Sequence, residues 1–366
     1  MPNLLLCMTP GVGLNTWKGI GSLNRELRPY VEYVRRGWKV KILTFDSDKI
    51  PKLPEGMEAI CFPHHRLLWL LPWTHRELGS WADVIKTNQS SRAYYYTRAV
   101  KQWKKPILLR CGFVRGELQE TTDGLTLKTR RYQKKEAKAF QEATHCQVPT
   151  KELSKWVQKR YDIPKEKISV VPNFVDTDLF KPMERVQKKG KSIISFGRLA
   201  PVKQFGLLIN ACAAIPGCTL TIIGEGSERQ YLENLAKEQG VNLNLPGNLP
   251  NEELPKMLQE HRVFAITSIR EGHPKALIEA MACGVSCIGV DAIGIQNVIK
   301  HGENGWLVKP TVQDIKDGID TLLNDVLLSK NLGKNAHKFV KETFSFEGCF
   351  DLEYKNIQKL DRKYSK

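Results

Sequence analysis

The chain has 366 residues, of which 41% are hydrophobic and 26% charged, an ordinary composition for a globular protein with room for about two domains. It holds no run of about 18 apolar residues, so the sequence indicates no transmembrane helix. The formal net charge is +17, and residues 1–180 hold 31 Lys and Arg against 18 Asp and Glu, whereas residues 181–366 hold 25 against 21. A basic first half predicts contact with an anionic membrane surface, a phosphorylated substrate or nucleic acid.

Strands and helices are predicted to alternate along the first half. The chain begins without a basic leader, so its first residues indicate a core strand rather than a signal peptide. Elements that alternate in this way predict a parallel sheet that helices cover on both faces. Apolar runs predict strands at residues 4–8, 39–45, 56–62, 83–87, 106–110 and 145–148, and helices at 22–35, 90–104 and 125–142.

The second half repeats this alternation. A polar stretch at 173–190, which contains Pro182, is the expected boundary between the halves. We therefore expect two facing, doubly wound α/β domains, with a ligand-binding cleft at the carboxyl ends of their strands. The predicted strands are 192–196, 219–223, 243–246, 263–267 and 286–290, and the predicted helices are 204–215, 228–239, 250–259, 274–283 and 311–324.

Two acidic residues, Glu271 and Glu279, flank a predicted helix start. The strand predicted at 263–267 ends shortly before Glu271, and Pro274 is suited to the first turn of the helix that follows. The start of a helix carries roughly half a positive elementary charge and exposed N–H groups, which suit a diphosphate. Carboxylates bind sugar hydroxyls. This spacing therefore predicts a nucleotide-sugar site, with the diphosphate at the helix start, the ribose on one carboxylate and a hexose on the other.

A basic loop is predicted after the strand at 192–196. Gly197 lets the backbone approach a ligand closely, and Arg198 and Lys203 can both reach a diphosphate. Arginine offers a two-pronged donor and lysine a point charge. The alternative is an ordinary solvated loop, but loops that follow strands often carry function.

Two glycine pairs give weaker signals. Gly224 and Gly226 follow a predicted strand and resemble part of a dinucleotide-binding loop without its third glycine, so a tight turn is the alternative. Gly19 and Gly21 are expected to precede the first helix of the first domain, where they could contact the phosphates or the transferred sugar. Simple turn chemistry is again the alternative.

No metal site is expected. Asp46 with Asp48, and Asp176 with Asp178, form Asp-x-Asp triplets that could hold Mg²⁺, but turn and capping roles explain both more simply. The nine cysteines are scattered, and no second Cys or His pair accompanies the one at 283 and 287. Buried free thiols in a reducing compartment are the favoured interpretation.

Two segments of the first half could meet a membrane. Residues 64–73 place His and Arg beside a bulky apolar run with Trp69 and Trp73. This run could lie at a bilayer interface, and ordinary packing within the protein is an equal alternative. The basic stretch 128–135 could add attraction to anionic lipid, or it could be a solvated helix face.

Together these motifs resemble the retaining, metal-independent glycosyltransferases of family 4, also called glycosyl transferases group 1, which have the GT-B fold. The implied fold is α/β, with two facing Rossmann-like domains and an interdomain cleft. The resemblance is specific over the second domain and looser over the first. It rests on residues 172–176, 196–199 with Lys203, 224–226, 271–284 and 301–308, and in the first domain on 19–21 and 36–40.

The resemblance implies roles for the motif residues. Arg198 and Lys203 would bind the donor diphosphate, and Glu279 the donor ribose. Glu271 would contact the donor sugar or stabilise developing charge, so that Glu271, Arg198 and Lys203 form the catalytic group. The other donor-binding residues implied are Gly19, Gly21, Gly197, Gly224, Gly226, Leu249, Pro250, Gly272, His273, Pro274, Lys275, Ala276 and Leu277, with Leu249 and Pro250 beside the base.

The resemblance also implies an acceptor-binding domain at 1–172, a donor-binding domain at 173–345 and a helix at 346–366 that crosses back to the first domain. No metal or cofactor is implied. The chain departs from the family pattern at two places. Residues 110–113 offer no equivalent of the His that family members often carry in the first domain, and Asn297 stands where an acid is common.

We therefore expect a retaining hexosyltransferase that moves a sugar from a UDP- or GDP-sugar to a saccharide or lipid-linked acceptor, in cell-surface polysaccharide or glycolipid biosynthesis. Front-face departure of the diphosphate is expected, because no strong carboxylate nucleophile is evident in the first domain. The expected location is cytoplasmic, peripheral to the inner face of the membrane. A nucleotide-sugar epimerase or hydrolase of the same fold stays open, as does a nucleic-acid-binding protein, although no reader motif is present.

Overall fold

The computed structural model describes residues 1–366 except 48, 115, 117–125, 185 and 365–366. The described residues form two compact units. Unit 1 comprises Met1–Pro172 and Cys349–Lys366, and unit 2 comprises Asn173–Gly348. The last segment, which the sequence predicts as a helix from residue 346 that crosses back to the first domain, is part of unit 1 from Cys349 onward.

Unit 1 is built on a parallel sheet in the order β3-β2-β1-β4-β5-β6-β7. The predicted strands of the first half are confirmed, with ends that shift by one residue at most. The last strand, β7, was not predicted because three residues are too few to show a hydrophobic period. The strands are β1 Asn3–Cys7, β2 Lys39–Thr44, β3 Met57–Cys61, β4 Val84–Thr87, β5 Ile107–Arg110, β6 His145–Val148 and β7 Ile168–Val170.

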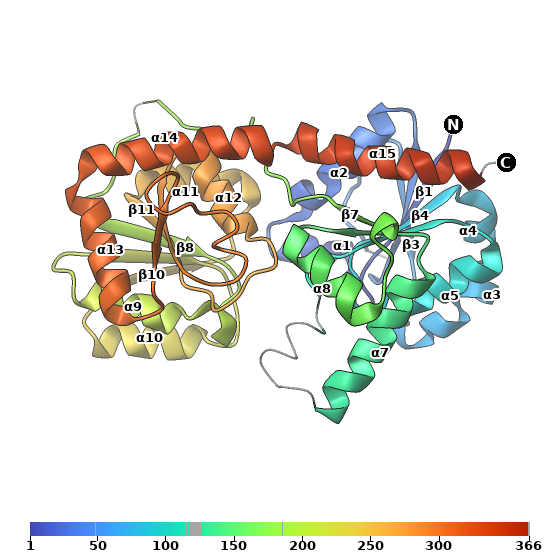
Figure 1. The fold of residues 1–366 in the computed structure, drawn as a ribbon, viewed down its shortest axis with the longest axis horizontal. Coiled ribbons are helices and arrows are strands. Elements are labelled where there is room, and N and C mark those ends of the chain that lie inside the picture. Colours follow the sequence, from blue (N-terminus) through green and yellow to red (C-terminus); the bar gives the residue numbers. More distant parts are fainter. Residues whose placement is uncertain (48, 115, 117–125, 185, 365–366) are drawn as a thin grey trace. The chain divides into compact units, whose positions relative to one another are not determined.

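Helices cover both faces of this sheet (Figure 1). One layer packs α5 against α3, α4 and α7, with α8 beside α7, and the other contains α1, α2 and α15. The predicted helix at 125–142 is observed from residue 127, and its first residue, Leu125, lies outside the described residues. The helices are α1 Leu14–Gly19, α2 Leu23–Arg35, η1 His65–Leu70, α3 Leu71–Thr74, α4 Arg76–Trp81, α5 Tyr94–Trp103, α7 Leu127–Glu142, α8 Lys151–Tyr161, η2 Lys165–Lys167 and α15 Phe346–Tyr364.

A buried ion pair holds α15 in unit 1. Glu353 of α15 pairs with Lys86 of β4, and it also accepts hydrogen bonds from Tyr33 at 3.2 Å and Gln147 at 2.9 Å. The ring of Phe350 packs edge-on against Tyr33 at 4.9 Å. Burying an ion pair is favourable only where further hydrogen bonds satisfy the charges, and here the carboxylate has three donors.

Unit 2 is built on a second parallel sheet, in the order β10-β9-β8-β11-β12-β13. The five predicted strands are confirmed. The edge strand β13 was not predicted, since it too has only three residues. The strands are β8 Ser192–Phe196, β9 Thr219–Ile223, β10 Asn242–Gly247, β11 Val263–Ile266, β12 Ser286–Val290 and β13 Trp306–Val308.

The helices of unit 2 also form two layers. One contains α9, α10 and α13, and the other contains α11, α12 and α14 (Figure 1). The helix predicted at 250–259 divides into a short 3-10 turn and α11, because Pro255 favours a helix start. The helices are η3 Pro201–Lys203, α9 Phe205–Ala213, α10 Arg229–Glu238, η4 Asn251–Glu253, α11 Leu254–Glu260, α12 Lys275–Ala282, α13 Val312–Asn324 and α14 Val326–Thr343.

Each sheet reverses its strand order once. In unit 1 the reversal falls between β1 and β4, and in unit 2 it falls between β8 and β11. Ligands of open α/β sheets bind beyond the carboxyl ends of the strands at such a reversal. The two α/β, Rossmann-like sheets predicted from the sequence are thus present. Among the described residues, no helix combines the length and the apolar character needed to cross a bilayer.

Candidate active site

The motifs predicted for unit 2 meet where its strand order reverses. The loops that leave β8 and β11 are residues 197–203 and 267–274, and these two strands are neighbours. The N–H of Ile269 donates to the carbonyl of Val202 at 3.0 Å, and Thr267 Oγ1 donates to the carbonyl of Lys203 at 2.9 Å. These bonds hold the two loops together, although they are far apart in the sequence.

Lys203 and Glu271 form a direct ion pair across these loops. The ammonium of Lys203 lies 2.6 Å from Glu271 Oε1, and Ser268 Oγ donates to the same oxygen at 2.7 Å. The side chains keep 21% and 16% of their surface exposed. An anion can therefore reach the ammonium and share it, while Ser268 keeps the carboxylate in place.

The loop after β8 brings a second cation to this edge. Gly197 has φ +153°, and a side chain there would begin 3.2 Å from Lys203 Cε, so the lysine stem lies against bare backbone. Arg198 is exposed, and no acidic side chain of the described chain pairs with it. Lys203 thus has a carboxylate partner, whereas the guanidinium of Arg198 is accessible to a ligand. This arrangement suits a diphosphate.

Gly224 and Gly226 let the loop after β9 pack on the loop after β8. A side chain at Gly224 would lie 2.0 Å from the carbonyl oxygen of Gly197, and one at Gly226 would lie 2.1 Å from that of Leu199. The N–H of Leu199 also donates to the carbonyl of Glu225 at 2.9 Å. The tight-turn alternative explains these two glycines, because any side chain would push the loops apart.

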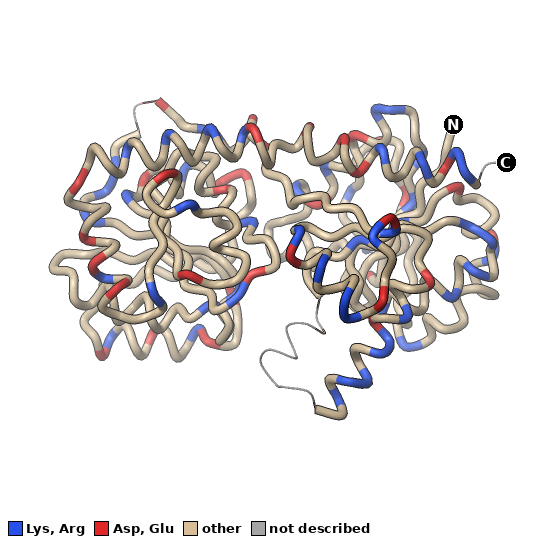
Figure 2. Tube along the Cα trace, viewed as in Figure 1, with Lys and Arg blue, Asp and Glu red and all other residues tan. Residues whose placement is uncertain are grey.

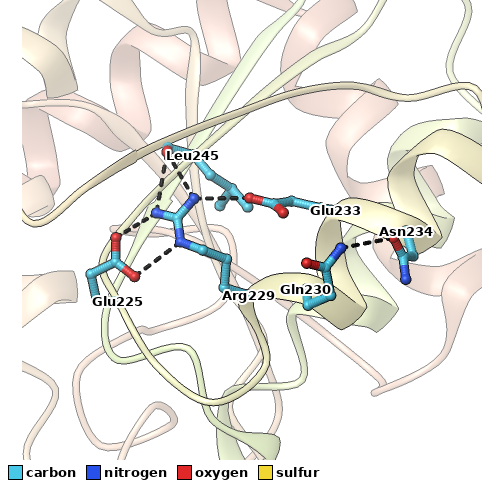
Figure 3. Close-up of polar contacts among 6 residues, drawn as sticks. All are labelled: Glu225, Arg229, Gln230, Glu233, Asn234 and Leu245. Carbon is cyan, nitrogen blue, oxygen red and sulfur yellow. Dashed lines mark hydrogen bonds and ion pairs between the residues drawn. The ribbon is translucent and has the colours of Figure 1, made fainter.

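Arg229, at the start of α10, fixes the same turn (Figure 3). Its guanidinium binds the Glu225 carboxylate with two N–H groups, contacts Glu233 Oε1 at 2.9 Å and donates to the carbonyl of Leu245 at 3.3 Å. These bonds lower the pKa of Glu225 below its ordinary value. The acid of this loop, Glu225, therefore has a structural partner, and the turn packs against the loop after β8.

The start of α12 presents its N-terminal N–H groups at the same edge. The helix begins at Lys275, one residue later than predicted, with Pro274 as its N-cap. The N–H of Leu277 donates to the carbonyl of Pro274 at 3.1 Å, so the N–H groups of Lys275 and Ala276 precede this first bond. With Gly272 just before them, these groups are suited to bind an anion.

Three contacts fix the chain that leads into α12. The N–H of Glu271 donates to the carbonyl of Ile293 at 2.9 Å, and Asn173 Nδ2 donates to the carbonyl of His273 at 3.1 Å. A side chain at Gly294, where φ is +91°, would lie 2.1 Å from the Glu271 carbonyl oxygen. Sequence reasoning gave Ile293 and Gly294 no role. A glycine four residues after the end of a predicted strand was the available signal.

His273 is buried beneath this loop, with 8% of its surface exposed. Its ring lies 4.8 Å from that of Phe344, edge to face, and its Nδ1 has no hydrogen-bond partner among the described residues. Burial lowers the pKa of His273 to about 4, with a smaller contribution from Lys275. The imidazole is therefore neutral at physiological pH and acts as packing under the loop.

Three further predicted residues lie at this edge of unit 2. Glu279 is one turn into α12 and is 1% exposed. Leu249, half-buried, and Pro250, exposed, follow β10. Their roles with the ribose and the base stay predictions.

The expected position of Gly19 and Gly21 is wrong. They do not precede the first helix of unit 1, because residues after β1 form a short helix, α1, that ends at Gly19. Gly21, with φ +71°, donates its N–H to the carbonyl of Lys18 at 3.0 Å and so caps α1. Gly19 is thus the last residue of α1, and Gly21 lies between α1 and α2.

The Asp-x-Asp triplets have capping roles. Asp46 accepts two backbone N–H groups at the start of α1, at 2.6 and 3.1 Å, and Asp176 accepts the N–H of Asp178 at 3.1 Å. The capping interpretation is thus confirmed for both, and Asp48 lies outside the described residues. Where side chains are described, no three His, Cys, Asp or Glu residues form a metal-binding group. All nine cysteines are present as thiols, and all except Cys61 are buried.

Comparison with known proteins covers most of the chain. The family model described as glycosyl transferases group 1 matches residues 176–339, and the model described as glycosyltransferase family 4 matches residues 30–179. An uncharacterized glycosyltransferase of Methanocaldococcus jannaschii is 30% identical over 59% of this chain and 60% of that protein. The lipopolysaccharide core glycosyltransferase LpsE of Rhizobium meliloti is 27% identical over 51% of this chain and 56% of that protein. The chain thus spans little more than half the length of these curated relatives.

Solved structures share the fold over nearly the whole chain. Sucrose-phosphate synthase of Thermosynechococcus elongatus has a TM-score of 0.81 at 19% identity, covering 98% of this chain and 99% of that one. Anabaena HepE in complex with UDP-glucose has a TM-score of 0.79 at 18% identity, covering 98% and 100%. The two family models together match residues 30–339, and the two sheets have the topology of the GT-B fold. The chain therefore belongs to glycosyltransferase family 4, the glycosyl transferases group 1.

Proposed function

We propose that the chain is a retaining hexosyltransferase that takes its sugar from a UDP- or GDP-sugar without the help of a metal. The observation that carries the proposal is the pairing of Lys203 with Glu271, beside the open cation Arg198, at the edge where α12 begins. The similar fold of HepE, solved with UDP-glucose, supports the donor class. Two cations and a helix start supply the positive charge that a metal supplies in other phosphate sites.

The reaction follows from these charges. The bond between the anomeric carbon and the diphosphate oxygen breaks, and its electron pair goes to the diphosphate. Arg198, Lys203 and the first N–H groups of α12 stabilise that growing negative charge. The acceptor hydroxyl attacks the same face, and its proton passes to the departing diphosphate. Glu271 positions Lys203 before the donor arrives and then faces the sugar.

The proposed acceptor is a saccharide or a lipid-linked saccharide bound by unit 1. The apolar run at 64–73 divides in the structure: Leu68 and Leu71 are buried, whereas Leu67, Trp69 and Trp73 are 45%, 47% and 56% exposed. Indole side chains in such positions favour a membrane interface. Basic residues recur along α7 (Figure 2), and six of them are exposed, namely Lys128, Arg130, Arg131, Lys134, Lys135 and Lys138.

These features support a peripheral position at an anionic, cytoplasmic membrane surface, in the synthesis of cell-surface polysaccharide or glycolipid. Sedimentation with anionic vesicles at low salt tests the position. The protein is expected to bind, and Trp69→Ser/Trp73→Ser is expected to bind about tenfold more weakly, since two indoles leave the interface. A protein that stays in the supernatant at low salt contradicts the membrane proposal.

A donor screen tests the proposed reaction. Thermal shifts across UDP-, GDP- and ADP-sugars identify the donor, and the labelled donor is then incubated with EDTA, with and without a lipid extract as acceptor source. Transfer of label into the extract is expected, with the anomeric configuration of the donor kept. Release of free sugar or of an epimer, whether or not the extract is present, would instead support the hydrolase or epimerase. Strict dependence on a divalent ion would contradict the metal-free site.

A further inference from the structure

A pocket in unit 1 lies at the carboxyl side of the sheet. Its volume is about 350 Å³. Three segments line it: the start of η1, which follows β3, the stretch from Ser90 into α5, which follows β4, and one face of α7. These segments are distant in the sequence, so no local motif announced the pocket. Loops beyond the carboxyl ends of parallel strands are where ligands of such sheets are expected.

Each segment contributes one cation to the pocket: Arg66, Arg92 and Lys135. All three are exposed, and across the described ranges no carboxylate forms an ion pair with any of them. By contrast Lys138, one turn further along α7, pairs with Glu142 at 3.8 Å and covers the ring of Tyr94 at 5.0 Å. Cations that converge from three segments without acids to neutralise them are suited to a phosphate group.

The acid at the pocket, Glu136, has its charge satisfied below the surface. Its carboxylate accepts hydrogen bonds from Ser90 Oγ at 2.8 Å, the N–H of Gly116 at 2.9 Å and Tyr161 Oη at 2.8 Å, and the residue is 3% exposed. Glu136 therefore fastens the loop after β4 to α7. It fixes the frame of the pocket and leaves the three cations available.

Arg92 is held in a strained backbone conformation. Its φ is +57°, in the left-handed region that non-glycine residues rarely adopt. Strain of this kind persists where the surrounding structure fixes it, often at ligand sites. Tyr94 and Tyr95 follow after Ala93, with ring centroids 5.8 Å apart, and Tyr132 of α7 also lines the pocket. Half-buried tyrosine rings give a sugar both an apolar face and a hydroxyl.

We propose that this pocket binds the phosphate of a phosphorylated acceptor, with Arg66, Arg92 and Lys135 on the phosphate and the tyrosines beside the adjoining sugar. The proposal rests on the transfer reaction proposed above, and it names the acceptor class. The exposed Leu67 is the next residue after Arg66, and the exposed Trp69 is three residues after it. A phosphate that carries a lipid tail therefore fits this position, with the tail toward the apolar side chains.

Binding of glucose 1-phosphate to the full chain tests the phosphate site, with UDP present in excess to occupy the donor site. Arg92→Gln/Lys135→Gln should bind it at least about tenfold more weakly, because a hydrogen bond to a charged group contributes about 1.5–3 kcal/mol. Lys128→Gln/Arg131→Gln is the matched control, since it removes two charges from exposed residues outside the pocket. Equal losses in both variants, or no loss in the pocket variant, would overturn the proposal.

Vesicles that contain phosphatidic acid distinguish the two sources of phosphate. A lipid-linked acceptor predicts that the pocket variant loses vesicle binding more than the control variant does. If only glucose 1-phosphate binding is lost, the phosphate site stands and its ligand is a soluble sugar phosphate. Donor binding, measured with UDP, should be unchanged in the pocket variant. If the wild-type chain binds no nucleotide, the proposed transfer reaction is contradicted. The binding of glucose 1-phosphate then tests the pocket proposal alone.

Discussion

Two lysine–glutamate pairs, one in each unit, show how burial changes the effect of such a contact. In unit 1, Lys86 and Glu353 keep 2% and 8% of their side-chain surface exposed, whereas in unit 2 Lys203 and Glu271 keep 21% and 16%. Glu353 also accepts from Tyr33 and Gln147, so no ligand can enter. The enclosed pair anchors a helix, and the open pair is available to an anion.

The electrostatics of the enclosed pair agree with an anchoring role. Burial by itself raises the pKa of Glu353, but the charges of Lys86 and Arg110 outweigh it and hold that pKa below its ordinary value. Burial lowers the pKa of Lys86. The Lys86 ammonium and the Glu353 carboxylate thus stabilise each other, and removing one side chain leaves the other charge buried without its partner.

The largest effect is expected from Glu353→Leu. It leaves the Lys86 ammonium buried without its carboxylate, which should cost about 3–5 kcal/mol of unfolding free energy. Urea unfolding of the full chain measures it. The double variant Lys86→Met/Glu353→Leu should recover most of the loss, because neither charge stays in the core. A single variant as stable as the wild type would remove the contrast between the two pairs.

Lys203→Met should behave in the opposite way. The partly exposed pair contributes about 1 kcal/mol or less to stability, but turnover should fall by roughly 10²–10³, as for loss of one transition-state donor. Steady-state kinetics with the identified donor measures the rate, and Arg198→Ala should lose a similar factor. Lys191→Met, at the other end of β8, is the control and should be fully active. Normal rates in both site variants would contradict the assignment.

A smaller effect is expected from His273. Its pKa is about 4 in the folded chain and about 6.5 when unfolded, so its contribution to stability is present above pH 6.5 and is lost as the pH falls toward 4. The loss should reach roughly 3 kcal/mol below pH 4. In His273→Phe this part of the pH dependence should disappear, whereas His64→Phe, on an exposed residue, should keep it. Identical pH profiles for the wild type and His273→Phe would show that the imidazole is not held neutral.

Strands of four or more residues could be predicted from the sequence in both units, because apolar runs between glycines and polar turns mark them. The short edge strands β7 and β13 could not, since three residues show no period. The helix α1 was missed as well. Its six residues are capped by Asp46, which lies beyond α2 in the sequence, so the local signal is weak.

The parts of the donor site could be predicted one by one, but their contacts could not. Lys203 and Glu271 belong to separate motifs, and the order of β8 and β11 in the sheet brings them together. The pocket in unit 1 could not be predicted, although two segments that line it, at 64–73 and 128–135, stood out as basic. Arg66, Arg92 and Lys135 lie on three segments, and only the packing of α5 against α7 and η1 gathers them.

A crystal structure of the chain with its UDP- or GDP-sugar, grown in the presence of EDTA, tests the central claim most directly. The diphosphate is expected against Arg198, Lys203 and the first N–H groups of α12, with Lys203 turned from Glu271 toward the phosphates. A donor bound elsewhere, with the Lys203–Glu271 pair unchanged and the start of α12 empty, would contradict it.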